Sequence, residues 1–209
     1  METAVHFTSS GYRIEGLLDE GESRAVVITH PHSLYGGNMY NPVVESIAAS
    51  YRQHAYTTLR FNFRGVESSQ GRYDDGRGEQ EDIRQAIVYL QQQGFGPIDL
   101  SGYSFGTWVN ARYATERTAP ITMTMVSPPT AFMDFRTVGR LLGLVLAVTG
   151  SRDDIAPPDM LRRMVPIWNS SAVLEVVPGA DHFYGSHLDT LGTTLRNALQ
   201  PIAGVTAES

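Results

Sequence analysis

The chain has 209 residues, a formal net charge of -6 and no cysteine. The length suits one continuous core, so we expect residues 1–209 to fold as a single domain. The acidic balance argues against a nucleic-acid partner, because binding a phosphate backbone requires basic surface. The lack of cysteine excludes disulfides, thiolate nucleophiles and cysteine-based zinc sites.

The N-terminal residues METAVHFTSSG contain no basic leader followed by an apolar segment. No apolar run in the sequence is long enough to cross a bilayer. We therefore expect a cytoplasmic protein with no membrane partner. The sequence predicts no particular oligomeric state.

The first part of the chain carries two different apolar patterns. Val5–Thr8 and Tyr12–Leu18 alternate apolar and polar residues on either side of a Ser-Ser-Gly turn, which predicts an antiparallel hairpin. The run Arg24–Thr29 is nearly continuous in apolar residues, as in a strand buried on both faces of a parallel sheet. Asn41 and Pro42 then supply an N-cap and a first-turn proline for a helix.

The rest of the chain alternates strands with helices. A polar, glycine-rich loop over Asn62–Gly78 precedes an apolar stripe at helical spacing around Ile83–Leu90. The other predicted strands are Tyr56–Phe61, Ile98–Ser101, Ile121–Val126, Gly143–Thr149 and Ala172–Val177, and the other predicted helices are Thr107–Ala114, Pro158–Ile167 and Leu188–Leu199. Alternating strands and helices form βαβ units. The pattern predicts an α/β fold, with a mostly parallel sheet of roughly eight strands and helices on both faces.

The segment IDLSGYSFG joins a predicted strand to a predicted helix through a G-x-S-x-G pentapeptide. Ser104 would occupy a tight, strained turn, and Gly102 and Gly106 would let strand and helix approach because they lack Cβ atoms. The turn would expose the Ser104 hydroxyl and direct the N–H of Phe105 toward an oxyanion. The segment resembles the nucleophile elbow of the α/β-hydrolase superfamily.

The resemblance implies that an acid and then a histidine follow Ser104 along the chain. After the strand Gly143–Thr149, the sequence GSRDDIAP is similar to the family's G-x-x-D-x-[IV]-x-P turn, which makes Asp153 the acid and leaves Asp154 as the alternative. After the last strand, PGADHF resembles the family's G-x-x-H segment, which makes His182 the general base.

The loop after Arg24–Thr29 reads HPHSLYGGNM, and the resemblance implies that it supplies the second oxyanion donor. Many relatives carry His-Gly where this chain carries His30-Pro31. Alignment on His30 makes the N–H of His32 the first candidate for the second donor, with the N–H groups of Ser33 and Leu34 as alternatives.

The stretch Ser127–Leu142 lies where hydrolases of this fold often insert a lid, and it is too short for one. We therefore expect no lid or cap domain, and an open cleft. Apolar side chains on the loops at the carboxyl ends of the strands predict an apolar substrate site, although ordinary core packing would explain them equally. These substrate-binding candidates are Leu34, Tyr35, Phe132, Met133, Phe183 and Tyr184.

Together these features imply a serine hydrolase that cleaves a carboxylic ester or thioester of a small acyl substrate through an acyl-enzyme, without metal or cofactor. Two alternatives stay open. One is a binding module that keeps the hydrolase fold without catalysis, although such modules typically lose a member of the triad. The other is a peptidase or amidase, although such enzymes in this fold usually carry an extra domain that this chain has no room for.

A metal site is a separate hypothesis for the same histidines. His30-x-His32, together with Asp181 and His182, has side chains that commonly bind zinc. Metallo-β-lactamase-like enzymes, however, carry a contiguous H-x-H-x-D-H sequence, which this chain does not continue after Ser33. The sequence therefore favours the serine hydrolase.

Overall fold

The structure of the protein, a computed structural model, describes residues 1–204; residues 205–209, the end of the predicted domain, lie outside the described part. The strands are β1 (Thr3–Ser9), β2 (Tyr12–Asp19), β3 (Ala25–Thr29), β4 (Thr57–Phe61), β5 (Ile98–Tyr103), β6 (Met123–Val126), β7 (Leu144–Gly150) and β8 (Val173–Val177). The longer helices are α1 (Pro42–Arg52), α2 (Arg77–Gln92), α3 (Phe105–Thr115), α4 (Pro158–Trp168) and α5 (Leu188–Gly204), and short 3-10 turns cover Ser33–Tyr35 and Gly185–His187.

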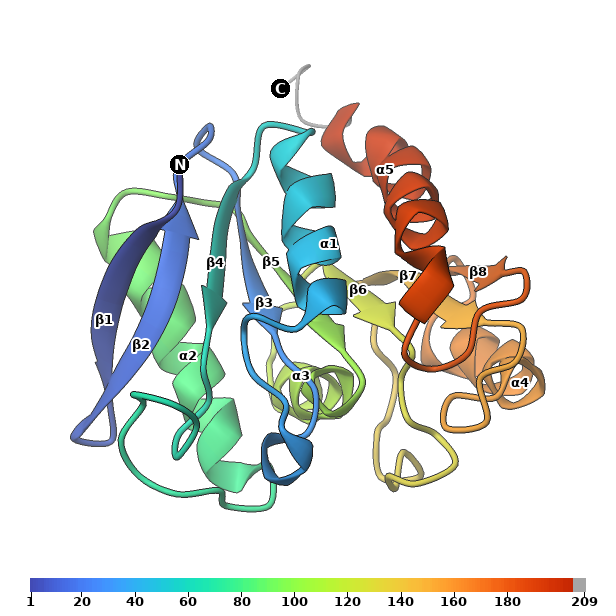
Figure 1. Cartoon of the computed structure of the whole chain (residues 1–209), viewed down its shortest axis with the longest axis horizontal. Coiled ribbons are helices and arrows are strands. Elements are labelled where there is room, and N and C mark those ends of the chain that lie inside the picture. Colours follow the sequence, from blue (N-terminus) through green and yellow to red (C-terminus); the bar gives the residue numbers. More distant parts are fainter. Residues whose placement is uncertain (205–209) are drawn as a thin grey trace.

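The strands form one eight-stranded sheet in the order β1-β2-β4-β3-β5-β6-β7-β8 (Figure 1). β1 and β2 pair as an antiparallel hairpin, and β2 also runs antiparallel to β4. All neighbours from β4 to β8 pair in parallel. The predicted fold class, a mostly parallel sheet of eight strands with an N-terminal hairpin, is confirmed.

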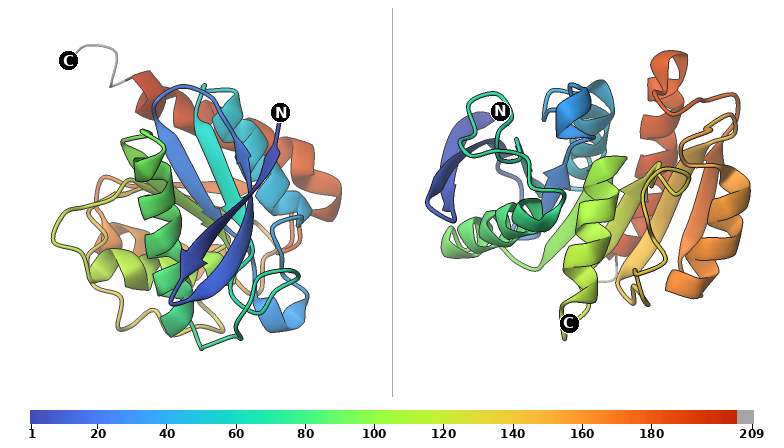
Figure 2. Two further views of the ribbon diagram at one scale, coloured as in Figure 1. Left: turned by 90° about the vertical axis from the view of Figure 1, so that its left-hand side faces the viewer. Right: turned by 90° about the horizontal axis from the view of Figure 1, so that it is seen from below.

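Helices cover both faces of the sheet, as the views in Figure 2 show. On one face, α1 and α5 pack side by side and bury Val44, Ile47 and Leu195 against the strands. On the other face, α2, α3 and α4 bury a second cluster that includes Ile83 and Val109. The central strands β3 and β4 are therefore buried over their whole length, which explains why β3 is a continuous apolar run rather than an alternating one.

Most predicted boundaries hold within two residues, and the differences have local causes. Asn41 caps α1 as predicted, since its side chain accepts a hydrogen bond from the N–H of Val43. α2 begins at Arg77, inside the predicted loop, after Gly76 takes a left-handed conformation. β6 begins only at Met123, because only from there does it pair with β5 and β7.

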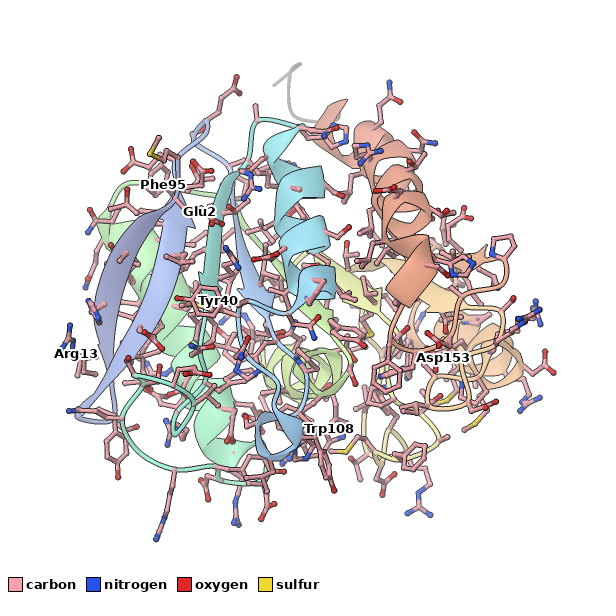
Figure 3. All side chains as sticks on the ribbon, in the orientation of Figure 1. Glu2, Arg13, Tyr40, Phe95, Trp108 and Asp153 are labelled. Atoms are coloured by element: carbon pink, nitrogen blue, oxygen red, sulfur yellow. The ribbon has the colours of Figure 1, made fainter. Side chains whose placement is uncertain are left out.

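Parallel strands place their carboxyl ends at one edge of the sheet, which is the lower edge in Figure 1. The loops that follow β3, β5, β6, β7 and β8 therefore meet there, and Asp153 lies among them (Figure 3). The segment between β6 and β7 contains turns but no helix or strand, so no lid covers this edge. Within residues 1–204, no helix is both long and apolar enough to cross a membrane.

Candidate active site

Ser104 occupies the turn between β5 and α3 with φ 53° and ψ -121°, a conformation that side-chain-bearing residues rarely adopt. The two flanking glycines permit this turn. A Cβ on Gly106 would lie 2.8 Å from the backbone oxygens of Thr29 and His30, and a Cβ on Gly102 would lie 2.4 Å from Thr29 Oγ1. The elbow is therefore packed directly against the end of β3, and only glycine fits at both positions.

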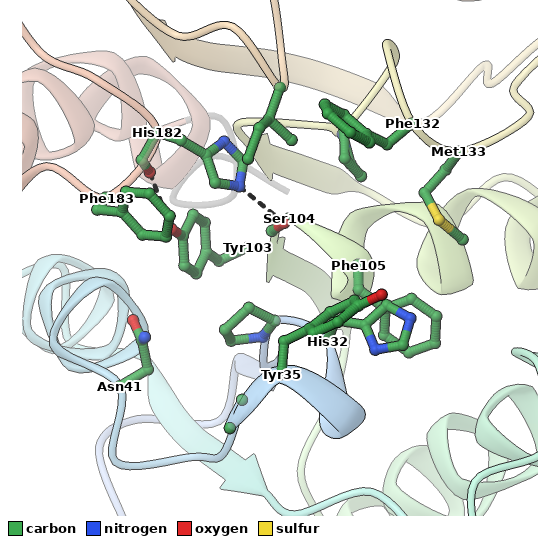
Figure 4. A pocket seen from close by; sticks show the side chains of 15 residues that line it. His32, Tyr35, Asn41, Tyr103, Ser104, Phe105, Phe132, Met133, His182 and Phe183 are labelled. Carbon is green, nitrogen blue, oxygen red and sulfur yellow. Dashed lines mark hydrogen bonds between the residues drawn. The ribbon is translucent and has the colours of Figure 1, made fainter.

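The structure brings together the three side chains that the sequence predicts as a triad. Ser104 Oγ lies 2.9 Å from His182 Nε2 (Figure 4). His182 Nδ1 lies 3.0 Å from both carboxylate oxygens of Asp153. The side chains come from the loops after β5, β8 and β7, and all three are buried. The arrangement places an imidazole where it can accept the proton of the serine hydroxyl.

Asp153 is held in place by backbone donors as well as by the imidazole. Its Oδ1 accepts hydrogen bonds from the N–H groups of Ile155 (2.9 Å) and Ala156 (2.7 Å). Burial alone would raise the pKa of Asp153, but hydrogen bonding and charge interaction with His182, together with the Ala156 N–H, lower the pKa below its ordinary value. Asp154, the alternative acid, is exposed and has no such contacts.

The loop that carries His182 is fixed by two tyrosines. The Tyr103 hydroxyl donates to the backbone carbonyl of His182 at 2.8 Å. Tyr184 adopts φ 55°, is fully buried, and its hydroxyl lies 2.8 Å from Ser127 Oγ. The prediction that Tyr184 belongs to the substrate site is wrong, because the left-handed turn at this residue directs its side chain into the core.

Ser104 lines an open cavity of about 470 Å³ (Figure 4). Its wall is largely apolar, and the titratable side chains that line it in the described part of the chain are those of His182, His32 and two tyrosines. The lining residues are Pro31, His32, Tyr35, Gly36, Gly37, Asn41, Tyr103, Ser104, Phe105, Pro129, Phe132, Met133, Ile155, His182 and Phe183. Tyr35, Phe132 and Phe183 are 86%, 72% and 70% exposed, so they form the rim of an open cavity.

Four of the six predicted substrate-binding residues line this cavity, namely Tyr35, Phe132, Met133 and Phe183. Leu34 does not, because the 3-10 turn leaves its side chain 65% exposed outside the lining. The sequence analysis did not assign seven other lining residues to the cavity, namely Pro31, Gly36, Gly37, Asn41, Tyr103, Pro129 and Ile155. Of these, Tyr103 could have been predicted from the sequence, because it immediately precedes the proposed nucleophile Ser104.

His30 is buried, and both of its ring nitrogens are used by the backbone. Its Nε2 accepts from the N–H of Phe63 at 3.0 Å, so Nδ1 carries the proton and donates to the carbonyl of Pro31 at 2.6 Å. Burial lowers the pKa of His30 to about 4. Neither nitrogen is left to bind a metal ion, and no group of three metal-binding side chains occurs within the described part of the chain.

His32 lies at the start of the Ser33–Tyr35 turn, beside the elbow. Its ring centroid is 4.7 Å from those of Phe105 and Tyr35 and 5.1 Å from that of Tyr73. Burial lowers the pKa of His32, and the charge of Asp75 opposes that effect. The imidazole is therefore neutral at pH 7.

Comparison with known proteins agrees with this geometry. No family model matches the chain. An uncharacterised protein of Rickettsia prowazekii is 32% identical over 195 residues, which cover 86% of this chain and 81% of that protein. The structure of an α/β serine hydrolase homologue from Coxiella burnetii is similar, with a TM-score of 0.86, 30% identity and coverage of 95% of this chain and 97% of that one. The structure of XC6422 from Xanthomonas campestris, an α/β serine hydrolase without a lid, has a TM-score of 0.88, 27% identity and coverage of 96% and 94%.

The sheet, the serine elbow and these relatives define the class of the protein: it has the fold of a lidless α/β serine hydrolase. Both structures match nearly the whole chain, so the likeness is not confined to the elbow. The chain belongs to the α/β-hydrolase superfamily.

Proposed function

We propose that the protein is a serine hydrolase that cleaves a carboxylic ester or thioester of a small acyl substrate. The observation that supports this most directly is the continuous row of hydrogen bonds from Ser104 Oγ through His182 to Asp153, with distances of 2.9 and 3.0 Å. A serine hydroxyl becomes an effective nucleophile when a neighbouring base removes its proton. Ser104 and His182, at one end of this row, line a cavity large enough for a small substrate.

In the proposed reaction, Ser104 Oγ attacks the acyl carbonyl carbon while His182 Nε2 takes the hydroxyl proton. Asp153 stabilises the imidazolium and keeps the ring in the tautomer whose Nε2 accepts that proton. The tetrahedral intermediate collapses, and His182 returns the proton to the leaving alcohol or thiol. Water, activated by the same imidazole, then attacks the acyl-enzyme and releases the acid.

The proposed oxyanion donors are the N–H groups of Phe105 and His32. Phe105 is the first residue of α3, where backbone N–H groups are unpaired and the helix dipole favours negative charge. Both residues line the cavity. Of the alternatives, Ser33 and Leu34 do not line it, and the Leu34 N–H is already donated to His32 Nδ1.

The cavity also supports a substrate class. Its rim is apolar and open to solvent, and within residues 1–204 no Lys, Arg, Asp or Glu side chain lines it, which favours an uncharged acyl group. Because no lid covers the rim, a short acyl chain would be more completely enclosed than a long one.

The test is a panel of p-nitrophenyl esters and acyl-thioesters of increasing chain length, hydrolysed by the wild type and by Ser104→Ala. We expect the substitution to lower kcat by at least about 10⁴-fold. Asp153→Asn should lower kcat by about 10⁴-fold as well, whereas Asp154→Asn, an exposed neighbour, should leave it unchanged. A fluorophosphonate probe should label the wild type at Ser104 and not Ser104→Ala. If the wild type neither turns over any member of the panel nor reacts with the probe, the protein is a binding module and the proposal is wrong.

A further inference from the structure

The imidazole of His32 makes two hydrogen bonds, and together they indicate which ring nitrogen carries the proton. Nδ1 accepts from the N–H of Leu34 at 3.3 Å, and Nε2 lies 3.3 Å from the hydroxyl of Tyr73. A backbone N–H can only donate, so Nδ1 must be unprotonated. A neutral imidazole then carries its proton on Nε2 and donates it to the Tyr73 oxygen.

The first of these bonds organises the loop that follows β3. His32 is the N-cap of the 3-10 turn Ser33–Tyr35, and its side chain satisfies the free N–H of Leu34. The His32 carbonyl also accepts the N–H groups of Tyr35 and Gly37, both at 3.0 Å. The turn is thus built on the polar atoms of a single residue, the same residue whose N–H we propose as an oxyanion donor.

The ring also reaches the other proposed donor. Its centroid lies 4.7 Å from that of Phe105, whose backbone begins α3. Tyr73 packs against both rings, with centroids 5.1 Å from His32 and 5.8 Å from Phe105. The segment that carries Tyr73 precedes α2 and is remote in sequence from both donors, so their spacing depends on a tertiary contact.

We infer that His32 is a positioning residue for the oxyanion hole, and that Tyr73 acts through it by accepting the hydrogen bond from Nε2–H and holding the ring in the orientation whose Nδ1 caps the turn. This inference rests on the proposed function. The orientation of the ring matters because turning Nδ1 away from the N–H of Leu34 leaves that N–H without its acceptor. The cap would then be lost, and the backbone N–H of His32 would no longer be held in one direction.

Side-chain variants at position 32 test the inference without removing the backbone donor. His32→Asn keeps an acceptor at the position of Nδ1, because asparagine caps turns in the same way. His32→Leu removes the acceptor. We expect His32→Leu to lower kcat for a p-nitrophenyl ester by about 10- to 100-fold with KM changed less than about twofold, because the oxyanion forms only in the transition state. His32→Asn should stay within about threefold of the wild type.

The double variant separates the hydrogen bond between Tyr73 and His32 from ordinary packing. Tyr73→Phe should lower kcat by about three- to tenfold in the wild-type background and have no effect in the His32→Asn background, because the shorter asparagine has no Nε2 for the Tyr73 hydroxyl to hold. If the Tyr73 hydroxyl only fills space, its removal should lower kcat by the same factor in both backgrounds. His6→Leu and Tyr89→Phe, which lie on β1 and α2 away from the cavity, are matched controls that should leave kcat unchanged.

Three kinetic results would each overturn the inference: a His32→Leu kcat equal to that of the wild type, a His32→Asn loss as large as that of His32→Leu, or an equal Tyr73→Phe loss in both backgrounds. If His32→Leu does not fold, His32→Gln replaces it, since its amide reaches toward Tyr73 and not toward Leu34.

Nitrogen-15 NMR of the imidazole gives a readout without turnover. We expect the Nε2–H form for His32 at pH 7.5, and finding the Nδ1–H form would also overturn the inference. A wild type that hydrolyses no ester overturns the proposed function instead.

Discussion

The hydroxyl of Tyr103 donates a 2.8 Å hydrogen bond to the backbone carbonyl of His182. The residue before the nucleophile thus holds the loop that carries the imidazole, and the two rings also stack with centroids 5.4 Å apart. The elbow therefore supports the position of the proposed base as well as that of the nucleophile.

Tyr103→Phe removes this bond and leaves the ring in place. We expect kcat to fall by about three- to tenfold, because the imidazole is held less firmly against Ser104. The free energy of unfolding should fall by about 1 to 2 kcal/mol. Tyr51→Phe is the matched control: its buried hydroxyl donates to Thr124 Oγ1 at 3.0 Å, so it should lose similar stability with no change in kcat. Equal kcat for Tyr103→Phe and the wild type would contradict the expectation.

Gly106→Ala tests the close contact between the elbow and β3. The new Cβ would lie 2.5 Å from Thr29 Oγ1 and 2.8 Å from two backbone oxygens, so strand or helix must move. We expect the free energy of unfolding to fall by about 2 to 3 kcal/mol, together with a large loss of ester hydrolysis. Urea denaturation measures the first effect.

Gly139→Ala provides the comparison for that measurement, since the nearest atom to its new Cβ, Thr115 Cγ2, is 3.9 Å away. Its stability should change by less than about 0.5 kcal/mol. Similar stabilities for the two alanine variants would mean that the elbow tolerates a side chain at Gly106.

The sequence predicted the sheet, and it named three triad candidates that the structure brings within hydrogen-bonding distance, because both depend on local pattern. Buried parallel strands are apolar runs, and each triad candidate lies in the loop that follows a parallel strand. The elbow needs glycines for steric reasons that can be read from one pentapeptide. Asp153 could be separated from Asp154 only by the motif, and the structure adds the physical reason, since only Asp153 accepts the backbone donors of its turn.

The surroundings of the site were harder to predict because they depend on contacts between distant segments. Tyr73 lies beside His32 only after the loop before α2 folds across the sheet edge. The sequence predicts that Asn41 caps a helix, which it does, but Asn41 also lines the cavity. A loop has no regular periodicity from which to distinguish an exposed aromatic ring from a buried one, so the sequence predicts the same role for Phe183 and Tyr184.

His30 predicts how stability depends on pH. The folded protein keeps this buried imidazole neutral down to about pH 4, whereas the unfolded chain takes up the proton near pH 6.5. Between these values the unfolded state binds more protons, so stability falls as pH falls. A shift of this size corresponds to about 3 kcal/mol over the interval. Asp153, with its lowered pKa, loses its contribution only below pH 3.8, outside this window.

The check is urea denaturation of the wild type and of His30→Gln at pH 7.5 and 4.5. Glutamine does not titrate, so the variant should lose much less stability than the wild type between the two pH values, even if it is less stable at pH 7.5. The pKa of His32 is also lowered by burial, but His32 is present in both proteins, so its effect on stability cancels in the comparison. Parallel pH profiles would show that His30 is not the group responsible.

Phe183 and Tyr184 are adjacent in sequence, but the structure places their side chains in opposite environments. Phe183 is 70% exposed on the rim of the cavity, whereas Tyr184 is fully buried with its hydroxyl on Ser127. Phe183→Ala should raise KM for an apolar ester by about fivefold, because it removes apolar contact area from the bound substrate. It should change the free energy of unfolding by less than about 0.5 kcal/mol.

Tyr184→Phe should show the reverse pattern. It should lower the free energy of unfolding by about 1 kcal/mol through the loss of a buried hydrogen bond, with KM unchanged because its ring does not reach the cavity. Michaelis–Menten kinetics and urea denaturation on both variants measure the two effects independently. A rise in KM for Tyr184→Phe, with none for Phe183→Ala, would mean that the substrate reaches the core side of this loop and that the proposed cavity is not where it binds.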